Sequence, residues 1–78
     1  MARLRSVDRY RMINLRSGEI VLVFKPYPGM RPMHSFCRAC LEHDIQIDSG
    51  NYRLEVMRQD VDTKKFSWCK VYKVYMEA

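Results

Sequence analysis

The alternation of apolar and polar positions predicts a β-hairpin in the first third of the chain. Apolar residues gather in residues 9–16 and in the continuous run 20–24, and the pair Ser17-Gly18 separates these two runs. Two β-rich runs around such a pair are typical of a hairpin, because glycine supplies the positive φ of a tight turn. The unbroken second run favours an interior strand, covered on both faces or on one face by a partner.

A single helix is predicted after the turn residues Pro26-Tyr27-Pro28-Gly29. Pro32 suits the first helical position, where a missing N–H costs nothing. From Met33 onward, apolar residues recur at positions 33, 36, 37, 40 and 41. This spacing forms one apolar stripe on a helix of about three turns.

Strands are predicted again in the second half of the chain. Residues 44–48 alternate and indicate a short strand, and residues 52–56 alternate as a half-buried strand does. A polar loop at 60–65 precedes a last strand at 66–76. The alternation in that strand is imperfect, because Tyr72 and Tyr75 cannot share a face without a bulge.

These elements predict an α+β fold. We expect an antiparallel sheet of four to five strands with one amphipathic helix packed on one face, in the order ββ-α-(β)ββ. The chain is expected to be a single domain, residues 1–78, with residues 1–8 forming a flexible basic arm. One helix cannot cover both faces of such a sheet, so the other face is either solvated or a binding surface.

Composition supports one small folded domain and argues against export or membrane insertion. The chain has 78 residues, 47% of them hydrophobic and 29% charged. No apolar run approaches the roughly 20 residues needed to span a bilayer. The N-terminal residues lack the apolar segment of a secretory signal, and three cysteines do not indicate a disulfide framework. We therefore expect a cytoplasmic protein, in the host cytoplasm if it is viral, with no membrane partner.

The string from His34 to His43 carries the residues that metal or thiol chemistry would use. His34, Cys37 and Cys40 are spaced at three residues, and the segment resembles a short piece of a RING finger. The whole chain has only three cysteines and two histidines, too few for a RING finger, so ubiquitin-ligase function is not inferred. A single zinc would use His34, Cys37, Cys40 and the distant Cys69.

Two other interpretations of the same cysteines do not involve a metal. Cys37 and Cys40 would form a redox-active thiol pair if the helix began near Ser35, because a helix N-terminus lowers a thiol pKa. The simpler interpretation, which we favour, places both cysteines on the apolar stripe as small core residues. We accordingly expect no metal and no cofactor.

No catalytic motif accompanies these residues. The chain has no nucleophile elbow, no phosphate-binding glycine loop and no carboxylate pair at catalytic spacing. The two histidines both fall on the predicted helix. We therefore expect a protein that is not an enzyme.

Charge is distributed unevenly along the chain, although the net charge is only +5. Residues 1–16 hold five arginines and one aspartate, residues 17–63 hold five basic and seven acidic side chains, and residues 64–78 hold four lysines and one glutamate. If the first and last strands are neighbours, a basic patch with interleaved aromatic residues forms on one edge. The residues predicted to bind a partner are Arg3, Arg5, Arg9, Arg11, Lys70, Lys73 and Tyr75.

Such a surface predicts a small non-enzymatic binding protein. Arginine, tyrosine and tryptophan are enriched at protein interfaces, and a free-standing protein of this size is typical of a phage or mobile-element inhibitor or modulator of a host protein or nucleoprotein complex. The alternative is a sequence-nonspecific nucleic-acid-binding protein, because cations and aromatic rings also grip phosphates and bases. A third interpretation is a solvated basic face without a partner, since lysines on an edge strand also prevent aggregation. A homodimer is a further alternative.

Overall fold

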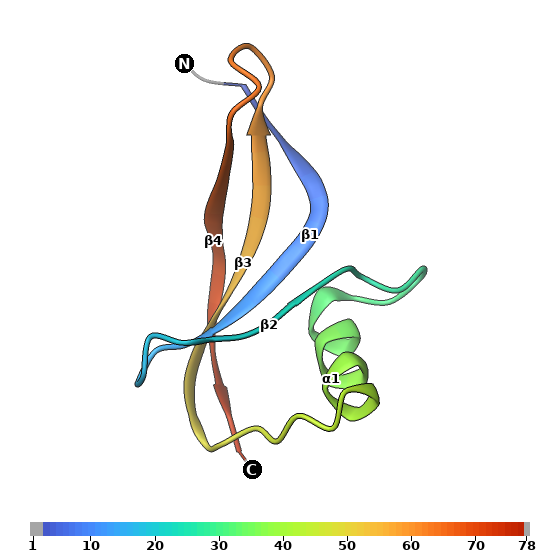
Figure 1. Ribbon diagram of the computed structural model, residues 1–78, viewed down its shortest axis with the longest axis vertical. Helices are drawn as coiled ribbons and strands as arrows, with labels where there is room; N and C mark the ends of the chain where they lie inside the picture. The colour runs from blue at the N-terminus through green and yellow to red at the C-terminus, as the bar shows by residue number, and fades with distance from the viewer. Residues whose placement is uncertain (1–2, 78) are drawn as a thin grey trace.

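The strands predicted at both ends of the chain form one antiparallel sheet, and the helix lies on one side of it (Figure 1). The computed structural model describes residues 3–77. Its elements are β1 (Leu4–Asn14), β2 (Ile20–Phe24), α1 (Pro32–Glu42), β3 (Gly50–Asp60) and β4 (Phe66–Met76). The strand order is β2-β1-β3-β4. The α+β class and the ββ-α-ββ order are therefore confirmed.

The predicted hairpin forms β1 and β2, but β2 does not lie inside the sheet. The two strands pair antiparallel, with Tyr10 opposite Phe24 and Met12 opposite Leu22. Gly18 has φ 77°, and its N–H donates to the carbonyl of Asn14 at 2.7 Å. The expectation of an interior strand at 20–24 was wrong, because β2 pairs only with β1 and forms one edge. Its continuous apolar run instead serves packing against α1 on one side.

The core lies between α1 and one face of the sheet, which we call the covered face. Met12, Phe36 and Leu54 are fully buried there, and Tyr52 is 2% exposed. The ring centroids of Phe24 and Phe36 lie 5.6 Å apart, so the edge strand and the helix meet through aromatic contact. Burial of these side chains supplies the main stabilising term, at about 1.5–3 kcal/mol for each large residue.

The segment 44–48 is not a strand, which corrects the expectation of a fifth one. The chain from 45 to 48 has no regular structure, and Ile45 and Ile47 pack against the core. Their alternation therefore reflects a loop with two inward side chains. Tyr52 fastens the end of this loop, because its hydroxyl donates to the carbonyl of Asp48 at 2.7 Å.

The sheet is longer than the helix that covers it. In Figure 1 the upper parts of β1, β3 and β4 extend well beyond α1 and β2. A flexible arm was expected at residues 1–8. Residues 1–2 lie outside the described residues, whereas residues 4–8 belong to β1, where Leu4 lies opposite Asp60 and Arg5 opposite Gln59. The register then shifts between Ser6 and Tyr10, which bends β1 away from β3.

The last strand contains a bulge, but not between the two tyrosines that make its alternation imperfect. Leu54 lies opposite Tyr72 and Glu55 opposite Lys70, so Val71 is the extra residue. Pairing is regular from Tyr72 onward, so Tyr72 and Tyr75 lie on opposite faces of the sheet. Within residues 3–77, α1 is the single helix, and it is too short and too polar to cross a membrane.

Candidate partner-binding surface

The face of the sheet opposite α1, which we call the open face, gathers side chains from all four strands. Directly opposed residues of an antiparallel sheet project to the same side. On β3 the odd-numbered residues alternate with the buried Tyr52 and Leu54, and they therefore define the open face. Their register partners complete it. These residues are Arg5, Arg11, Ile13, Ile20, Val23, Asn51, Arg53, Glu55, Met57, Gln59, Phe66, Trp68, Lys70, Lys73 and Tyr75.

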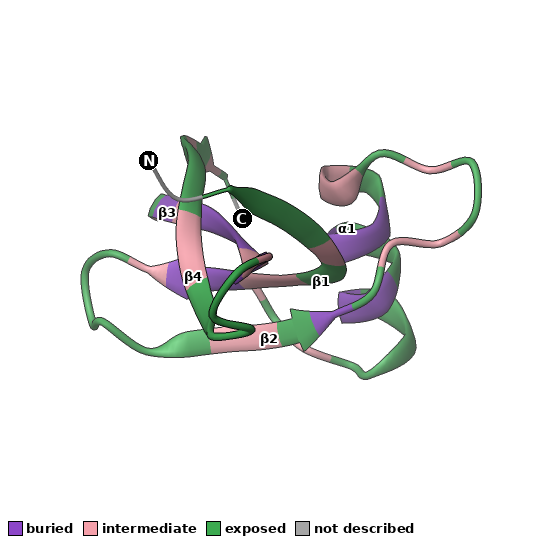
Figure 2. Cartoon of the chain, turned by 90° about the horizontal axis from the view of Figure 1, so that it is seen from above, coloured by how far each residue is buried: buried purple, intermediate pink, exposed green. Residues whose placement is uncertain are grey.

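Five of the seven residues predicted to bind a partner lie on the open face. Arg5 and Arg11 come from β1, and Lys70, Lys73 and Tyr75 come from β4. Figure 2 shows that buried residues concentrate on β3 and α1, whereas β4 is exposed or half-buried along its length. Cations from both ends of the chain thus share one uncovered surface with aromatic residues of β4, whereas Tyr10 and Tyr72 lie on the covered face.

The two terminal strands are not neighbours, which corrects the basis of the sequence prediction. β3 lies between β1 and β4, so the basic residues do not form a patch along one edge. The patch spreads across a face, and the middle of the chain contributes to it through Arg53 and Glu55. A charge tally along the sequence could not reveal this, because it counted 17–63 as a separate acidic segment.

Glu55 organises the centre of the open face. Its carboxylate accepts one hydrogen bond from the Nε of Arg11 at 2.7 Å and another from the Nε of Arg53 at 2.9 Å. The Glu55 side chain is only 7% exposed. Both carboxylate oxygens are therefore used, and one buried negative charge holds two guanidinium groups. This arrangement leaves the centre of the face positive.

Arg11 also orders the aromatic part of the surface. Its guanidinium carbon lies 4.5 Å from the centroid of the Trp68 ring, a cation–π contact. Farther along the same face, the Nε and Nη2 of Arg5 both donate to the side-chain oxygen of Gln59, at 3.1 and 2.8 Å. Both arginines are thus fixed by partners within the sheet. Lys70 and Lys73 differ, because neither forms an ion pair within residues 3–77.

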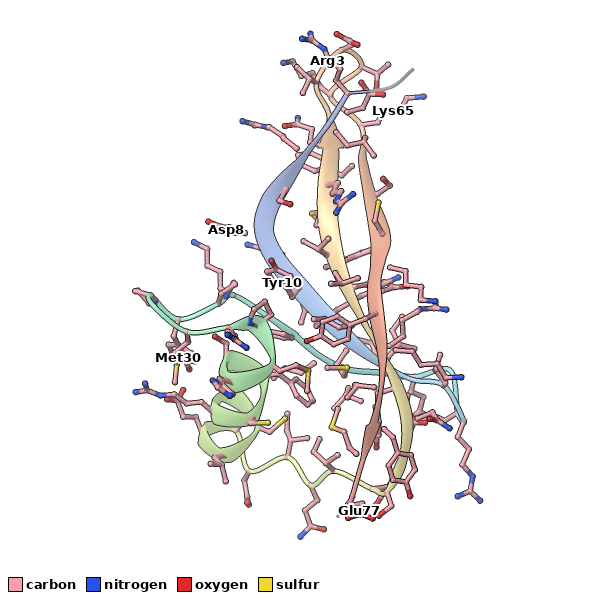
Figure 3. All side chains as sticks on the ribbon, turned by 180° about the vertical axis from the view of Figure 1, so that it is seen from behind. Arg3, Asp8, Tyr10, Met30, Lys65 and Glu77 are labelled. Carbon is pink, nitrogen blue, oxygen red and sulfur yellow. The ribbon has the colours of Figure 1, made fainter. Side chains whose placement is uncertain are left out.

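Arg3 and Arg9, the other two predicted residues, have no register partner on the open face. Arg3 forms an exposed ion pair with Asp62 at 3.2 Å. Figure 3 shows Arg3 and Lys65 at the end of the sheet farthest from Glu77. Arg9 lies within the irregular part of β1 and lines a hollow of about 200 Å³ beside β2. Neither residue joins the cluster around Glu55.

The cysteines do not come together as a metal site would require. Cys37 and Cys40 lie on α1, whereas Cys69 lies on β4 opposite Val56, and all three are free thiols. Within residues 3–77 no three His, Cys, Asp or Glu side chains are grouped so that they could hold a metal ion. His34 is exposed on the helix.

The helix also begins too early for the thiol interpretation. It starts at Pro32, so Ser35 is inside it rather than capping it. The Ser35 hydroxyl is buried and accepts the backbone N–H of Tyr27 at 2.9 Å, which ties the preceding loop to the helix. Burial, with a smaller contribution from the neighbouring thiol of Cys37, raises the pKa of Cys40. A reactive thiol needs the opposite shift.

A hollow of about 410 Å³ lies between β2, the loop 25–28 and α1. Its ionisable lining residues are Lys25, Tyr27 and His43. This lining contains neither a carboxylate nor a thiol that could serve as the partner of His43 in acid–base or nucleophilic chemistry. The open face is therefore the candidate site that best combines charge, aromatic surface and exposure.

Arg53 and Glu55 were not among the residues predicted from the sequence. Their signal was present in the alternation of 52–56, where they occupy the polar positions of a half-buried strand. Recognising their role required the strand order, which places them between the two basic strands. No protein-family model, curated protein or solved structure matches this chain.

Proposed function

We propose that this protein is a non-enzymatic binding protein whose open face engages a negatively charged protein or nucleoprotein complex. The supporting observation is that cations from both chain ends share one uncovered sheet face with aromatic side chains of β4. Arginine, tryptophan and tyrosine are the side chains that dominate binding energy at interfaces. In this proposal the protein acts by covering a surface of its partner, as a phage or mobile-element inhibitor or modulator of a host complex would.

Electrostatic complementarity is the main source of selectivity in the proposal. Lys70 and Lys73 lie on the outermost strand and have no counter-ion among residues 3–77, so their charges remain available to a partner. Positive surfaces of this kind steer an anionic partner and exclude a cationic one. Arg11 and Arg53 instead hold the centre of the surface in place through Glu55.

The test is affinity capture with charge-reversed variants. Lys70→Glu with Lys73→Glu reverses two exposed charges that form no ion pair with the described residues, so the fold should be retained. Reversing Arg11 is less informative, because a glutamate there would face Glu55 and destabilise the sheet. The matched control is Lys25→Glu with Arg31→Glu, which changes the net charge equally at exposed positions outside the open face.

Capture from the source cell should be done with and without nuclease. We expect a defined set of proteins that the wild type and the control variant retain and that the Lys70/Lys73 variant loses. Direct titration of the captured partner should then show affinity at least tenfold lower for the Lys70/Lys73 variant. Equal affinities of all three proteins for that partner would contradict the proposal.

A further inference from the structure

We infer that the open face binds single-stranded nucleic acid along β4, an inference that rests on the proposed function and specifies its partner. The open-face residues of β4 follow in the order Phe66, Trp68, Lys70, Lys73 and Tyr75. This strand therefore presents two aromatic rings, two cations and a third ring in a single row. The row spans about 30 Å from Phe66 to Tyr75, at about 3.3 Å per residue.

The rings at the two ends of the row are the most accessible aromatic residues on this face. Phe66 is 57% exposed and Tyr75 is 60% exposed. Leaving such large rings in water forgoes the stabilisation that burial would give. Stacking of an unpaired base on each ring would recover it, and such stacking tolerates any base because every base has a flat π face.

The cations between the rings suit a phosphate backbone. Lys70 and Lys73 lie on the outermost strand, and no carboxylate of residues 3–77 pairs with them. Glu55 is the only acidic residue on the described open face, and its two oxygens are already bound by Arg11 and Arg53. The path of the strand thus carries positive charge without a competing exposed anion.

Single-stranded nucleic acid fits this surface better than a duplex does. The aromatic rings are on a broad sheet face, and a duplex keeps the faces of its bases stacked inside. Duplex reading in the major groove uses an inserted helix or a two-stranded ribbon. Here α1 lies against the opposite face of the sheet, so it cannot take part in contacts to the open face.

Trp68 makes the inference directly measurable, because it is the only tryptophan in the chain. It lies in the row next to Phe66 and under the guanidinium of Arg11. We expect an oligothymidylate of about 15 nucleotides to quench its fluorescence. The logarithm of the association constant should fall linearly with the logarithm of salt concentration, at about −0.7 per neutralised phosphate.

Two pairs of substitutions separate the roles of charge and stacking. Lys70→Ala with Lys73→Ala should make the salt slope less steep by about 1.4, which corresponds to two phosphates. Phe66→Ala with Tyr75→Ala should lower the affinity at least tenfold and leave the slope unchanged. Tyr75→Phe alone should keep the affinity, and Lys25→Ala with Arg31→Ala should change neither quantity. Circular dichroism would confirm that every variant is folded.

Three outcomes would overturn the inference. They are an absence of quenching at low salt, equal affinity for a duplex of the same length, and tighter binding of polyglutamate than of oligothymidylate. The last result would identify an acidic polypeptide as the partner. In each case the proposed function would stand if the captured partner still depended on Lys70 and Lys73, and it would fall if that dependence were also missing.

Discussion

The two faces of this sheet are built from the same strands but are stabilised in different ways. On the covered face, Met12 and Leu54 are fully buried against α1. On the open face, the neighbouring Glu55 is almost as inaccessible, yet its carboxylate forms ion pairs with two arginine side chains. Side chains alternate along a strand, so adjacent residues of β3 serve stability on one side and display charge on the other.

This difference separates the residues that hold the fold from those that can contact a partner. Removing apolar contacts from the covered face should affect stability most. Changing the ion pairs should affect stability less, and changing exposed lysines should affect binding alone. The following substitutions test that order.

The largest loss of stability is expected from Leu54→Ala. Leu54 is 0% exposed, and truncation removes its contacts and leaves a cavity beneath α1. Such substitutions cost about 2–5 kcal/mol. Urea denaturation followed by circular dichroism would measure the change. Val23→Ala is the matched control, because Val23 is an exposed strand residue, and the expected change there is within about 0.5 kcal/mol. Equal losses for the two variants would contradict the division between the faces.

Glu55→Gln should have an intermediate effect. The amide keeps the shape of the side chain but no longer neutralises Arg11 and Arg53, which then repel each other in a partly buried site. We expect a loss of about 1–3 kcal/mol, by analogy with the removal of one partner from a buried polar interaction. Added salt should restore part of the stability, because it screens the repulsion between the arginines.

Asp62→Asn provides the control for Glu55→Gln. Asp62 also pairs with an arginine, but the side chains of Arg3 and Asp62 are 73% and 61% exposed. An exposed ion pair contributes about 0–1 kcal/mol. If this variant lost as much stability as Glu55→Gln, burial would not explain the importance of the central cluster.

The sequence alone was sufficient for most of the fold. The hairpin glycine, the proline at the start of the helix and the alternation of 52–56 each have a local physical cause, and each prediction was confirmed. The strand predicted at residues 44–48 was wrong, because two inward-facing isoleucines in a loop produce the same alternation as a strand. The edge position of β2 was missed because an apolar run does not say how many strands flank it.

The candidate site was predicted only in part, and the missing part depends on strand order. Arg11, Lys70 and Lys73 were recognised from their charge and their place in predicted strands. That they share a face follows from the position of β3 between β1 and β4, which local patterns do not encode. The ion pair of Glu55 with Arg11 joins residues 44 positions apart, so it becomes visible only in the folded chain.

A small effect of pH is expected on the covered side, where the loop before α1 meets the helix. The Tyr27 hydroxyl donates a hydrogen bond to the Glu42 carboxylate, and the Arg38 guanidinium lies 4.7 Å from the centroid of the Tyr27 ring. The hydrogen bond from Tyr27 holds the pKa of Glu42 below its ordinary value. The same bond is the main cause of a raised pKa at Tyr27.

The signs of these two shifts predict where stability changes. Because the pKa of Glu42 is lowered by folding, this carboxylate stabilises the fold at pH values above its unfolded pKa. That stabilisation is lost as the pH falls through the folded pKa. Because the pKa of Tyr27 is raised by folding, this hydroxyl stabilises the fold at pH values below its unfolded pKa. That stabilisation is lost as the pH rises through the folded pKa. Glu42→Gln should therefore weaken the dependence of the unfolding midpoint on pH at both extremes. Glu19→Gln, at an exposed position in the β1–β2 turn, is the control and should leave the pH dependence as it is in the wild type. An unaltered pH profile for Glu42→Gln would show that the hydrogen bond from Tyr27 does not contribute to stability.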